Sequence, residues 1–380
     1  MLKRLGVSLG ALVVSVVGAT ALSSEGFKTF GGANGGPRWE RAQKSPHFRE
    51  GKFQNTEATS LVKAGDMVPM MRDFLFGKEM RVPNCKLPLV TDGWKKFAAP
   101  AESGLRLTWM GHATTLIEVD GAAVLTDPMW SERASPSSWV GPRRFHAPPI
   151  ALEQLPKLDA VVVSHEHFDH LDMASVISLA KTGVVFHVPL GIGVHLESWG
   201  VPETQIKELD WWEEVQLSNG VRLVATPSRH FNGRGMPWRP GSSWTSWSVV
   251  GPRHKVYFSG DTGMSQHFPE IGQKLGPFDV ALLEIGQSNE KWADIHLGPV
   301  GAVEAAQKLQ AKRLFGIHWA TFELAYHPWN EPAETMTVEA GKRGLPVVTP
   351  RLGEPVEPEK GELGDTWWRA LPPIAEKCPN

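Results

Sequence analysis

The stretch LDAVVVSHEHFDHLD, residues 158–172, decides the fold class. It begins with an apolar run of the kind that fills the centre of a sheet, and it ends in a loop crowded with histidines and carboxylates. In extended backbone, residues i and i+2 point the same way, so His165 and His167 can reach one metal ion. Asp169 and His170 follow where the chain turns toward a helix, and they can face a second ion nearby.

Residues 165–170 follow the pattern H-x-H-x-D-H, which places four candidate metal ligands in six positions. A solvated, histidine-rich loop is the alternative, but this density directly after an apolar strand favours a metal site at a sheet edge. Imidazole and carboxylate together suit Zn²⁺, and also iron or manganese.

One loop cannot complete two coordination shells, so further ligands must come from elsewhere in the chain. Three more side chains of the right type end predicted apolar strands: His230, Asp261 and His318. Each alone is weak evidence, and their shared placement makes the prediction.

The surrounding sequence predicts an α/β fold. Apolar and polar residues alternate from residue 104, turn at Asp120-Gly121 and alternate again, which is typical of a β-hairpin. Later strands are predicted over 221–230, 242–251, 254–263, 278–286, 313–322 and 345–356, and helices over 172–181, 191–200, 298–311 and 334–344. Helices interleaved singly between strand groups favour a layered α/β sandwich of mixed sheets.

Composition places the chain among globular proteins. It has 380 residues, of which 41% are hydrophobic and 21% charged, and its net charge of −2 disfavours nucleic acid as a partner. With two cysteines, Cys85 and Cys378, a disulfide scaffold is excluded, and whether the two pair stays open.

Three regions are predicted along the chain. Residues 1–21 begin with Lys3 and Arg4, continue through an uncharged apolar stretch and end in ATA, which favours a cleaved export signal over an uncleaved membrane anchor. The protein is therefore expected to be exported, periplasmic or membrane-associated. Residues 22–100 are expected to be an extension packing on the main domain, and residues 101–380 to form that domain.

Longer motifs carry a resemblance to a known family. The metal-ligand pattern resembles the metallo-β-lactamase superfamily. TWMGHATTLIE (108–118), TDPMWSERASPSSWVGPRRF (126–145), YFSGDTG (257–263) and GIHWATFELA (316–325) are similar to N-acyl-phosphatidylethanolamine-hydrolysing phospholipases D and their bacterial relatives. The similarity runs from about residue 104 to 330. This chain has Ala320 where that family usually has glycine.

The resemblance implies a four-layer αβ/βα sandwich with two zinc ions at one edge of its sheets. Carried over by motif position, His165, His167 and His230 would bind one ion, Asp169, His170 and His318 the other, and Asp261 would bridge them. A hydroxide held between the ions is then expected to attack the phosphorus of a phospholipid phosphodiester.

Further roles are predicted with less support from the residues themselves. Asp169, Asp261 and His296 are expected to be catalytic. His296, His112 and Arg143 are candidates for binding substrate, with structural roles as the alternative for each. Core packing is the default expectation for Trp130, Trp139, Trp238 and Trp244, and the alternative is that their loops border an acyl-binding cleft.

Two other functions stay open. A metal-dependent lactonase or esterase would keep the ions and act on a small, phosphorylated substrate. A non-catalytic envelope protein would use neither, although the intact ligand set argues against that. A lipid substrate implies contact with a membrane surface, and the sequence leaves the oligomeric state open, a homodimer included.

Overall fold

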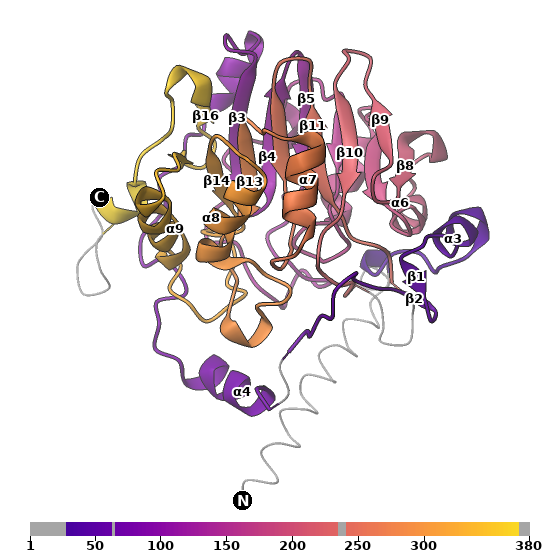
Figure 1. Ribbon diagram of the computed structural model, residues 1–380, viewed down its shortest axis with the longest axis horizontal. Coiled ribbons are helices and arrows are strands. Elements are labelled where there is room, and N and C mark those ends of the chain that lie inside the picture. The colour runs from indigo at the N-terminus through magenta and orange to yellow at the C-terminus, as the bar shows by residue number, and fades with distance from the viewer. Residues whose placement is uncertain (1–27, 63–64, 235–240, 372–380) are drawn as a thin grey trace, which may run out of the picture.

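The computed structural model describes residues 28–62, 65–234 and 241–371. Two sheets of seven strands each pack face to face (Figure 1). The first runs in the order β16-β3-β4-β5-β6-β7-β8 and the second in the order β15-β14-β13-β12-β11-β10-β9.

The strands of the first sheet are β3 (Leu105–Gly111), β4 (Thr114–Val119), β5 (Ala122–Thr126), β6 (Ala160–Val162), β7 (Phe186–Pro189), β8 (Ile206–Leu209) and β16 (Pro355–Val356). Those of the second are β9 (Glu214–Gln216), β10 (Arg222–Thr226), β11 (Ser246–Val250), β12 (Lys255–Phe258), β13 (Val280–Glu284), β14 (Leu314–Ile317) and β15 (Val347–Val348). The helices of the sandwich are α5 (Met173–Ala180), α6 (Gly193–Ser198), α7 (His267–Leu275), α8 (Gly298–Lys308) and α9 (Glu331–Lys342).

Alternating side chains build the layers. On β4, Ile117 faces the core between the sheets, whereas its neighbour Leu116 joins a second apolar cluster with Val176 of α5 and Leu196 of α6. Ala302 of α8 and other residues of α8 and α9 pack against the second sheet from its outer side. The four layers are therefore helix, sheet, sheet and helix, as predicted from the sequence.

Several predicted elements have different bounds in the structure. The Asp120-Gly121 hairpin forms, with β4 and β5 antiparallel. The strand predicted over 345–356 is instead two strands, because β15 pairs with β14 of the second sheet while β16 pairs with β3 of the first. The strand predicted over 313–322 ends at Ile317, since His318 and Ala320 have φ values of 70° and 54°.

Residues 28–100 lie along the sandwich and contain α3 (Gly36–Ala42), a short hairpin of β1 (Phe48–Arg49) with β2 (Lys52–Phe53), and α4 (Met67–Phe76). Figure 1 shows α4 standing apart from the two sheets, below them in this view. Cys85 forms a disulfide, and the other cysteine, Cys378, lies outside the described residues. The predicted boundary near residue 100 stays a prediction.

No helix in the described parts of the chain combines the length and apolar character needed to cross a bilayer. The predicted export segment, residues 1–21, lies outside those parts.

Candidate metal centre

Neighbouring strands deliver polar side chains to one edge of the sandwich. β5 is parallel to β6, and β12, β13 and β14 are parallel to one another, so their carboxyl ends meet at common edges. Just beyond these ends lie Asp127, the loop from His165 to His170, Asp261 and His318, and Glu284 is the last residue of β13.

One set of ligand atoms comes from three histidines and a carboxylate. His165 Nε2 lies 2.8 Å from His167 Nδ1, and His230 Nε2 lies 3.3 Å from the same nitrogen. Asp261 Oδ2 is 3.8 Å from His165 Nε2 and 3.9 Å from His230 Nε2. Four inward-facing atoms therefore surround one point at the sheet edge.

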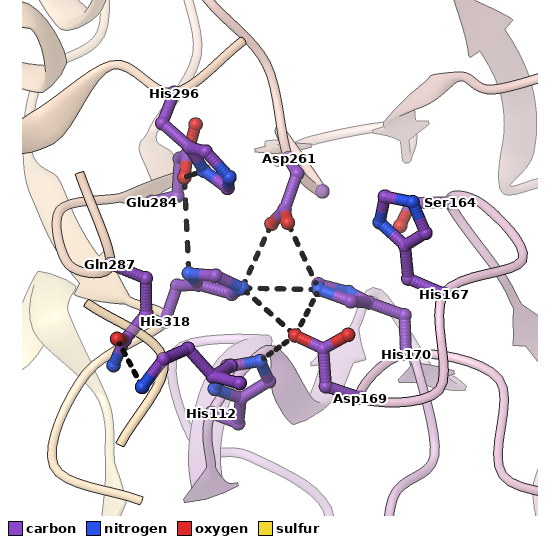
Figure 2. Close-up of polar contacts among 12 residues, drawn as sticks. His112, Ser164, His167, Asp169, His170, Asp261, Glu284, Gln287, His296 and His318 are labelled. Atoms are coloured by element: carbon purple, nitrogen blue, oxygen red, sulfur yellow. Dashed lines mark hydrogen bonds and ion pairs between the residues drawn. The ribbon is translucent and has the colours of Figure 1, made fainter. Parts of the chain in front are cut away.

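A second set shares Asp261 with the first. His170 Nε2 is 3.1 Å from His318 Nε2, and Asp261 lies 3.2 Å from the former and 3.1 Å from the latter (Figure 2). Asp169 Oδ2 completes the group, 3.3 Å from His170 Nε2 and 3.5 Å from His318 Nε2. The two sets meet at the Asp261 carboxylate.

This donor set fits metal cations. Two imidazole nitrogens that face each other form a hydrogen bond only when one of them carries a proton. His167 Nδ1 faces the nitrogens of both His165 and His230, so one proton cannot satisfy all three rings. Converging lone pairs of imidazole and carboxylate are the environment that Zn²⁺ and related ions prefer.

Electrostatics differ between the two sets. Burial, together with His170, His167 and His230, holds the pKa of His165 well below its ordinary value. Burial alone would also lower the pKa of His318, but Asp261 and Asp169 raise it to about 10. The first set therefore offers neutral imidazoles, whereas the carboxylates of the second set favour protonation of the imidazoles beside them.

Buried groups behind the ligands fix their orientation. Asp127 accepts hydrogen bonds from the Ser164 backbone N–H at 2.7 Å and from its hydroxyl at 2.6 Å, and it lies 2.7 Å from His170 Nδ1. At Gly260, with φ of 55°, an added Cβ would lie 2.3 Å from Ser164 Cβ. The close approach of Gly260 keeps Ser164, and through it Asp127, in place.

Glu166 and Asp172 belong to the support of the loop. Glu166 is buried and accepts hydrogen bonds from Ser242 Oγ at 2.7 Å and from the backbone N–H of Arg234 at 3.2 Å. The Arg234 guanidinium donates to the Glu166 carbonyl at 2.9 Å and also to the Leu171 carbonyl. Asp172 caps α5 by accepting from the Ser175 backbone N–H.

Glu284 connects the second set to His296. Its Oε2 lies 2.6 Å from His296 Nδ1 and 3.9 Å from His318 Nδ1, and its Oε1 accepts from the backbone N–H groups of Thr262 and Leu297 (Figure 2). Burial alone would lower the pKa of His296, but Glu284 raises it. Glu284 therefore favours the protonated form of His296 and holds its ring beside the ligands.

Asn55, from the N-terminal region, binds the backbone of His230 on both sides. Its Nδ2 donates to the His230 carbonyl at 2.8 Å, and its Oδ1 accepts from the His230 N–H at 3.2 Å and from Trp244 Nε1 at 3.2 Å. The Nδ1 of His230 lies 3.0 Å from the Ile295 carbonyl, which leaves Nε2 for the first set. Three contacts thus fix this imidazole.

A pocket of about 290 Å³ opens over the centre. His167, Asp169, Asp261, His296 and His318 supply its polar side. The remaining lining is mostly apolar and comes from several loops and from α4: Leu61, Val62, Met70, Phe231, Gln287, Trp292, Ile295, Leu324 and Tyr326.

The structure brings together all seven predicted ligands and places His296 in the pocket wall. It does not bring His112 or Arg143 to the pocket. His112 has no exposed surface and lies behind Asp169, its Nε2 2.8 Å from Asp169 Oδ2. Arg143 pairs with Glu132 in a different hollow.

Of the four tryptophans, those that the structure describes do not line this pocket, and Trp244 packs in the core, which is the default expectation. Trp130 lines that other hollow, Trp139 is 85% exposed, and Trp244 is buried against Asn55. Trp238 lies outside the described residues. In the part of the chain that the structure describes, the pocket tryptophan is Trp292.

Asp127, Glu284 and Asn55 were not predicted. Glu284 is a carboxylate at the end of an apolar strand, the same pattern that identified Asp261, so it could have been found. Asp127 follows β5 in the same way. Asn55 has no such pattern, because its partner is 175 positions away in the sequence.

Comparison with known proteins agrees with this geometry. The family model described as the beta-lactamase superfamily domain matches residues 122–319. An uncharacterised protein of Mycobacterium tuberculosis is 41% identical over 334 residues, 86% of this chain and 88% of that protein. The N-acyl-phosphatidylethanolamine-hydrolysing phospholipase D 1 of Caenorhabditis elegans is 37% identical over 270 residues, 67% of this chain and 76% of that enzyme.

Among solved structures, Igni18, a metallo hydrolase of the archaeon Ignicoccus hospitalis, aligns with a TM-score of 0.51 at 24% identity, over 66% of this chain and 97% of that one. A likeness of this degree supports the fold.

Proposed function

This chain belongs to the metallo-β-lactamase superfamily and is a metal-dependent hydrolase, and from that premise we propose that it cleaves a phosphodiester bond in a phospholipid. The reaction proposed is of the phospholipase D type, on N-acyl-phosphatidylethanolamine or a similar lipid. The observation that carries the proposal is a pair of ligand sets joined by Asp261 beneath a largely apolar pocket. The 37% identity to the nematode phospholipase supports the substrate class.

We propose zinc as the metal, in two ions per chain. His165, His167 and His230 would hold one, Asp169, His170 and His318 the other, and Asp261 both. Such ions, when bound, lower the pKa of water to about 7 and neutralise negative charge on a phosphate.

The protein's own groups position the reactants. His296, fixed at Nδ1 by Glu284 and lining the pocket, would bind a phosphate oxygen through its imidazole. Asp169, held by His112, would orient the attacking water, and Asp261 would keep the two ligand sets in register. None of these steps needs a serine or cysteine nucleophile.

The pocket lining fits a lipid better than a small polar lactone. Met70, Phe231, Trp292 and Leu324 surround the polar groups with apolar surface that an acyl chain can cover. A phosphodiester bound at the ligand sets would then extend its apolar part along this wall.

Incubating the purified, zinc-loaded protein with N-acyl-phosphatidylethanolamine in mixed micelles tests the proposal. Release of N-acylethanolamine and phosphatidic acid, measured by mass spectrometry, is expected. A phosphosugar lactone serves as the competing substrate. Faster turnover of the lactone, or no turnover of the lipid, would overturn the lipid assignment.

We also propose that the protein is exported and works at a membrane. The disulfide at Cys85 supports this location, because disulfides persist in oxidising compartments outside the cytosol. Detecting the protein in isolated periplasmic and membrane fractions is the expected result, and its recovery in the cytosol would contradict the proposal.

A further inference from the structure

Five of the ten large apolar side chains that are exposed on the described surface lie in two segments. The first is α4 with its flanks, where Val68 is 78%, Phe74 60% and Phe76 74% exposed. The second is the loop of residues 137–141, where Trp139 is 85% and Val140 48% exposed. Surface groups of this size and density usually mark an interaction site.

A single hollow brings the two segments to one face. It has a volume of about 970 Å³. Phe74 and Val82 line one side of it, and the chain from Gly141 to Phe145, which directly follows Val140, lines another. Phe74 of α4 and Gly141 at the end of the 137–141 loop therefore border the same depression, while Trp139 lines a second hollow that shares Glu132 and Arg133 with it.

This hollow carries positive charge. Arg144 is 8% exposed, and its guanidinium donates to the carbonyls of Met129 at 2.6 Å and His146 at 3.2 Å. Arg133 donates to the Gly141 carbonyl at 2.6 Å, and its Nε has no hydrogen-bond partner among the described residues. Neutral carbonyls bind these two cations without cancelling their charge.

The carboxylates that line the hollow are already paired. Glu132 lies 2.5 Å from Arg143, and Glu323 lies 3.7 Å from Arg81. Arg144 is buried and also lies in the field of the Asp172 carboxylate, so the positive charge that remains for an anion at the surface is that of Arg133. An apolar rim around a cationic hollow is complementary to the head-group region of an anionic lipid layer.

The same helix reaches the catalytic pocket. Met70 of α4 lines the pocket over the metal centre, and Phe74, four residues later on the same helix face, lines the cationic hollow. A lipid layer against this face would lie at the mouth of the catalytic pocket.

The chain also enters the described fold on this side. Lys28 and Thr29, its first described residues, line a hollow together with Ser138 and Trp139. The uncharged stretch from Leu5 to Leu22 precedes Lys28 by only a few residues in the sequence. If that stretch enters a bilayer, the bilayer lies close to Trp139.

We infer that α4, the 137–141 loop and the hollow between them form a membrane-docking face, which inserts its apolar side chains into a phospholipid bilayer and binds an anionic head-group phosphate through Arg133. The inference rests on the proposed function, because docking on this face would present lipid to the metal centre. Its test measures membrane binding and does not require the protein to hydrolyse the lipid.

Hydrogen exchange on the full chain tests the face directly. Vesicles of phosphatidylcholine with phosphatidylglycerol should slow amide exchange in Val68–Phe76 and in residues 137–141, and pure phosphatidylcholine should do so less. Because uptake is read segment by segment, binding by the Leu5–Leu22 stretch does not mask the result. Unchanged exchange in both segments would overturn the inference.

Substitutions separate the apolar contribution to membrane binding from the electrostatic contribution. Phe76→Ser combined with Trp139→Ser should weaken vesicle binding of these segments by about tenfold or more, because each side chain loses its apolar transfer. Val338→Ser, an equally polar change at a 45% exposed site on α9, is the matched control and should have no effect.

Arg133→Gln should reduce the preference for phosphatidylglycerol by about fivefold, the value of one cation near an anionic surface. Lys308→Gln on α8 is the charge-matched control and should keep that preference. A preference unchanged in Arg133→Gln would remove the head-group site from the inference.

Two comparisons separate this inference from the proposed function. Docking without hydrolysis of the lipid would support the docking face and reject the proposed substrate. Hydrolysis of micellar lipid without protection of either segment would support the proposed function and reject the docking face. If the double variant instead converts a dimer to a monomer in light scattering, and vesicles protect neither segment, a second copy covers this face and the docking inference fails.

Discussion

The metal centre and the rim of its pocket are built in opposite ways. The ligands His165, His170, His230 and His318 are at most 1% exposed, whereas Val68 and Phe76 on α4 are mainly exposed. Strand ends and buried carboxylates hold the ligands, while α4 stands apart from the sheets (Figure 1). The sandwich therefore supplies the ligands, and the N-terminal region adds Leu61, Val62 and Met70 to the wall of the pocket above them.

Breaking the ligand sets should have the largest effect. His165→Ala or Asp261→Asn should remove bound metal and lower hydrolysis by more than about a hundredfold, above the usual loss for an outer partner. Metal analysis and lipid turnover measure both effects. His187→Gln, a buried histidine of β7 outside the ligand sets, should retain its metal. A metal-free His165→Ala protein with full activity would contradict the mechanism.

Substituting the buried groups that orient the ligands should have a smaller effect than substituting the ligands themselves. Asp127→Asn turns an amide N–H₂ toward Ser164 or His170 in place of an acceptor, so we expect metal affinity to fall by about 10- to 100-fold. Competition with a fluorescent chelator measures the affinity, and circular dichroism checks the fold. Unchanged affinity in a folded variant would show that Asp127 does not orient His170.

Asn55 offers a direct way to sharpen the comparison, because it links the two regions. Asn55→Ala leaves the His230 backbone groups without their partner, and we expect about tenfold weaker metal binding with a loss of about 1–2 kcal/mol in stability. Gln54→Ala is the neighbouring control. The visible spectrum of the cobalt-substituted protein reports whether metal coordination by the first ligand set has changed.

The smallest effect is expected far from both regions, at His254. Its Nδ1 lies 2.6 Å from Asp120 and its Nε2 3.1 Å from Glu359. Burial alone would lower the pKa of His254, but Asp120 and Glu359 raise it. Its contribution to stability is therefore complete below the ordinary pKa of about 6.5 and is lost as pH rises through the raised value.

Urea unfolding of the metal-loaded protein checks this prediction. As pH rises above about 6.5, the wild type should lose more of its free energy of unfolding than His254→Gln does. Metal in excess keeps the ligand sets equal in both proteins. An identical loss in both proteins would mean that the pKa of His254 is not raised in the folded protein.

The sequence predicts those features of the protein that depend on residues close together in the chain. The His165–His170 loop, the Asp120-Gly121 hairpin and the strand-end residues Asp261 and His318 each follow from a few neighbouring residues. The splitting of 345–356 between two sheets did not, because both halves are apolar and only pairing partners distinguish them.

Long-range contacts explain the remaining failures. Asn55 meets His230 only in the folded protein. Val68, Phe74 and Phe76 of α4 are apolar residues of a region expected to pack on the main domain, and the structure shows them exposed. A periodic pattern predicts which residues share a helix face, but it does not say whether that face meets protein, solvent or another partner.

The bond between Asn55 and His230 also constrains the order of assembly. Asn55 is synthesised 175 residues before its partner, so the first ligand set cannot be completed until most of the chain is available and long loops have closed. A chain that folds only after export would therefore acquire its metal ions in the compartment that receives it, and the supply of those ions there would control how much metal-loaded protein forms.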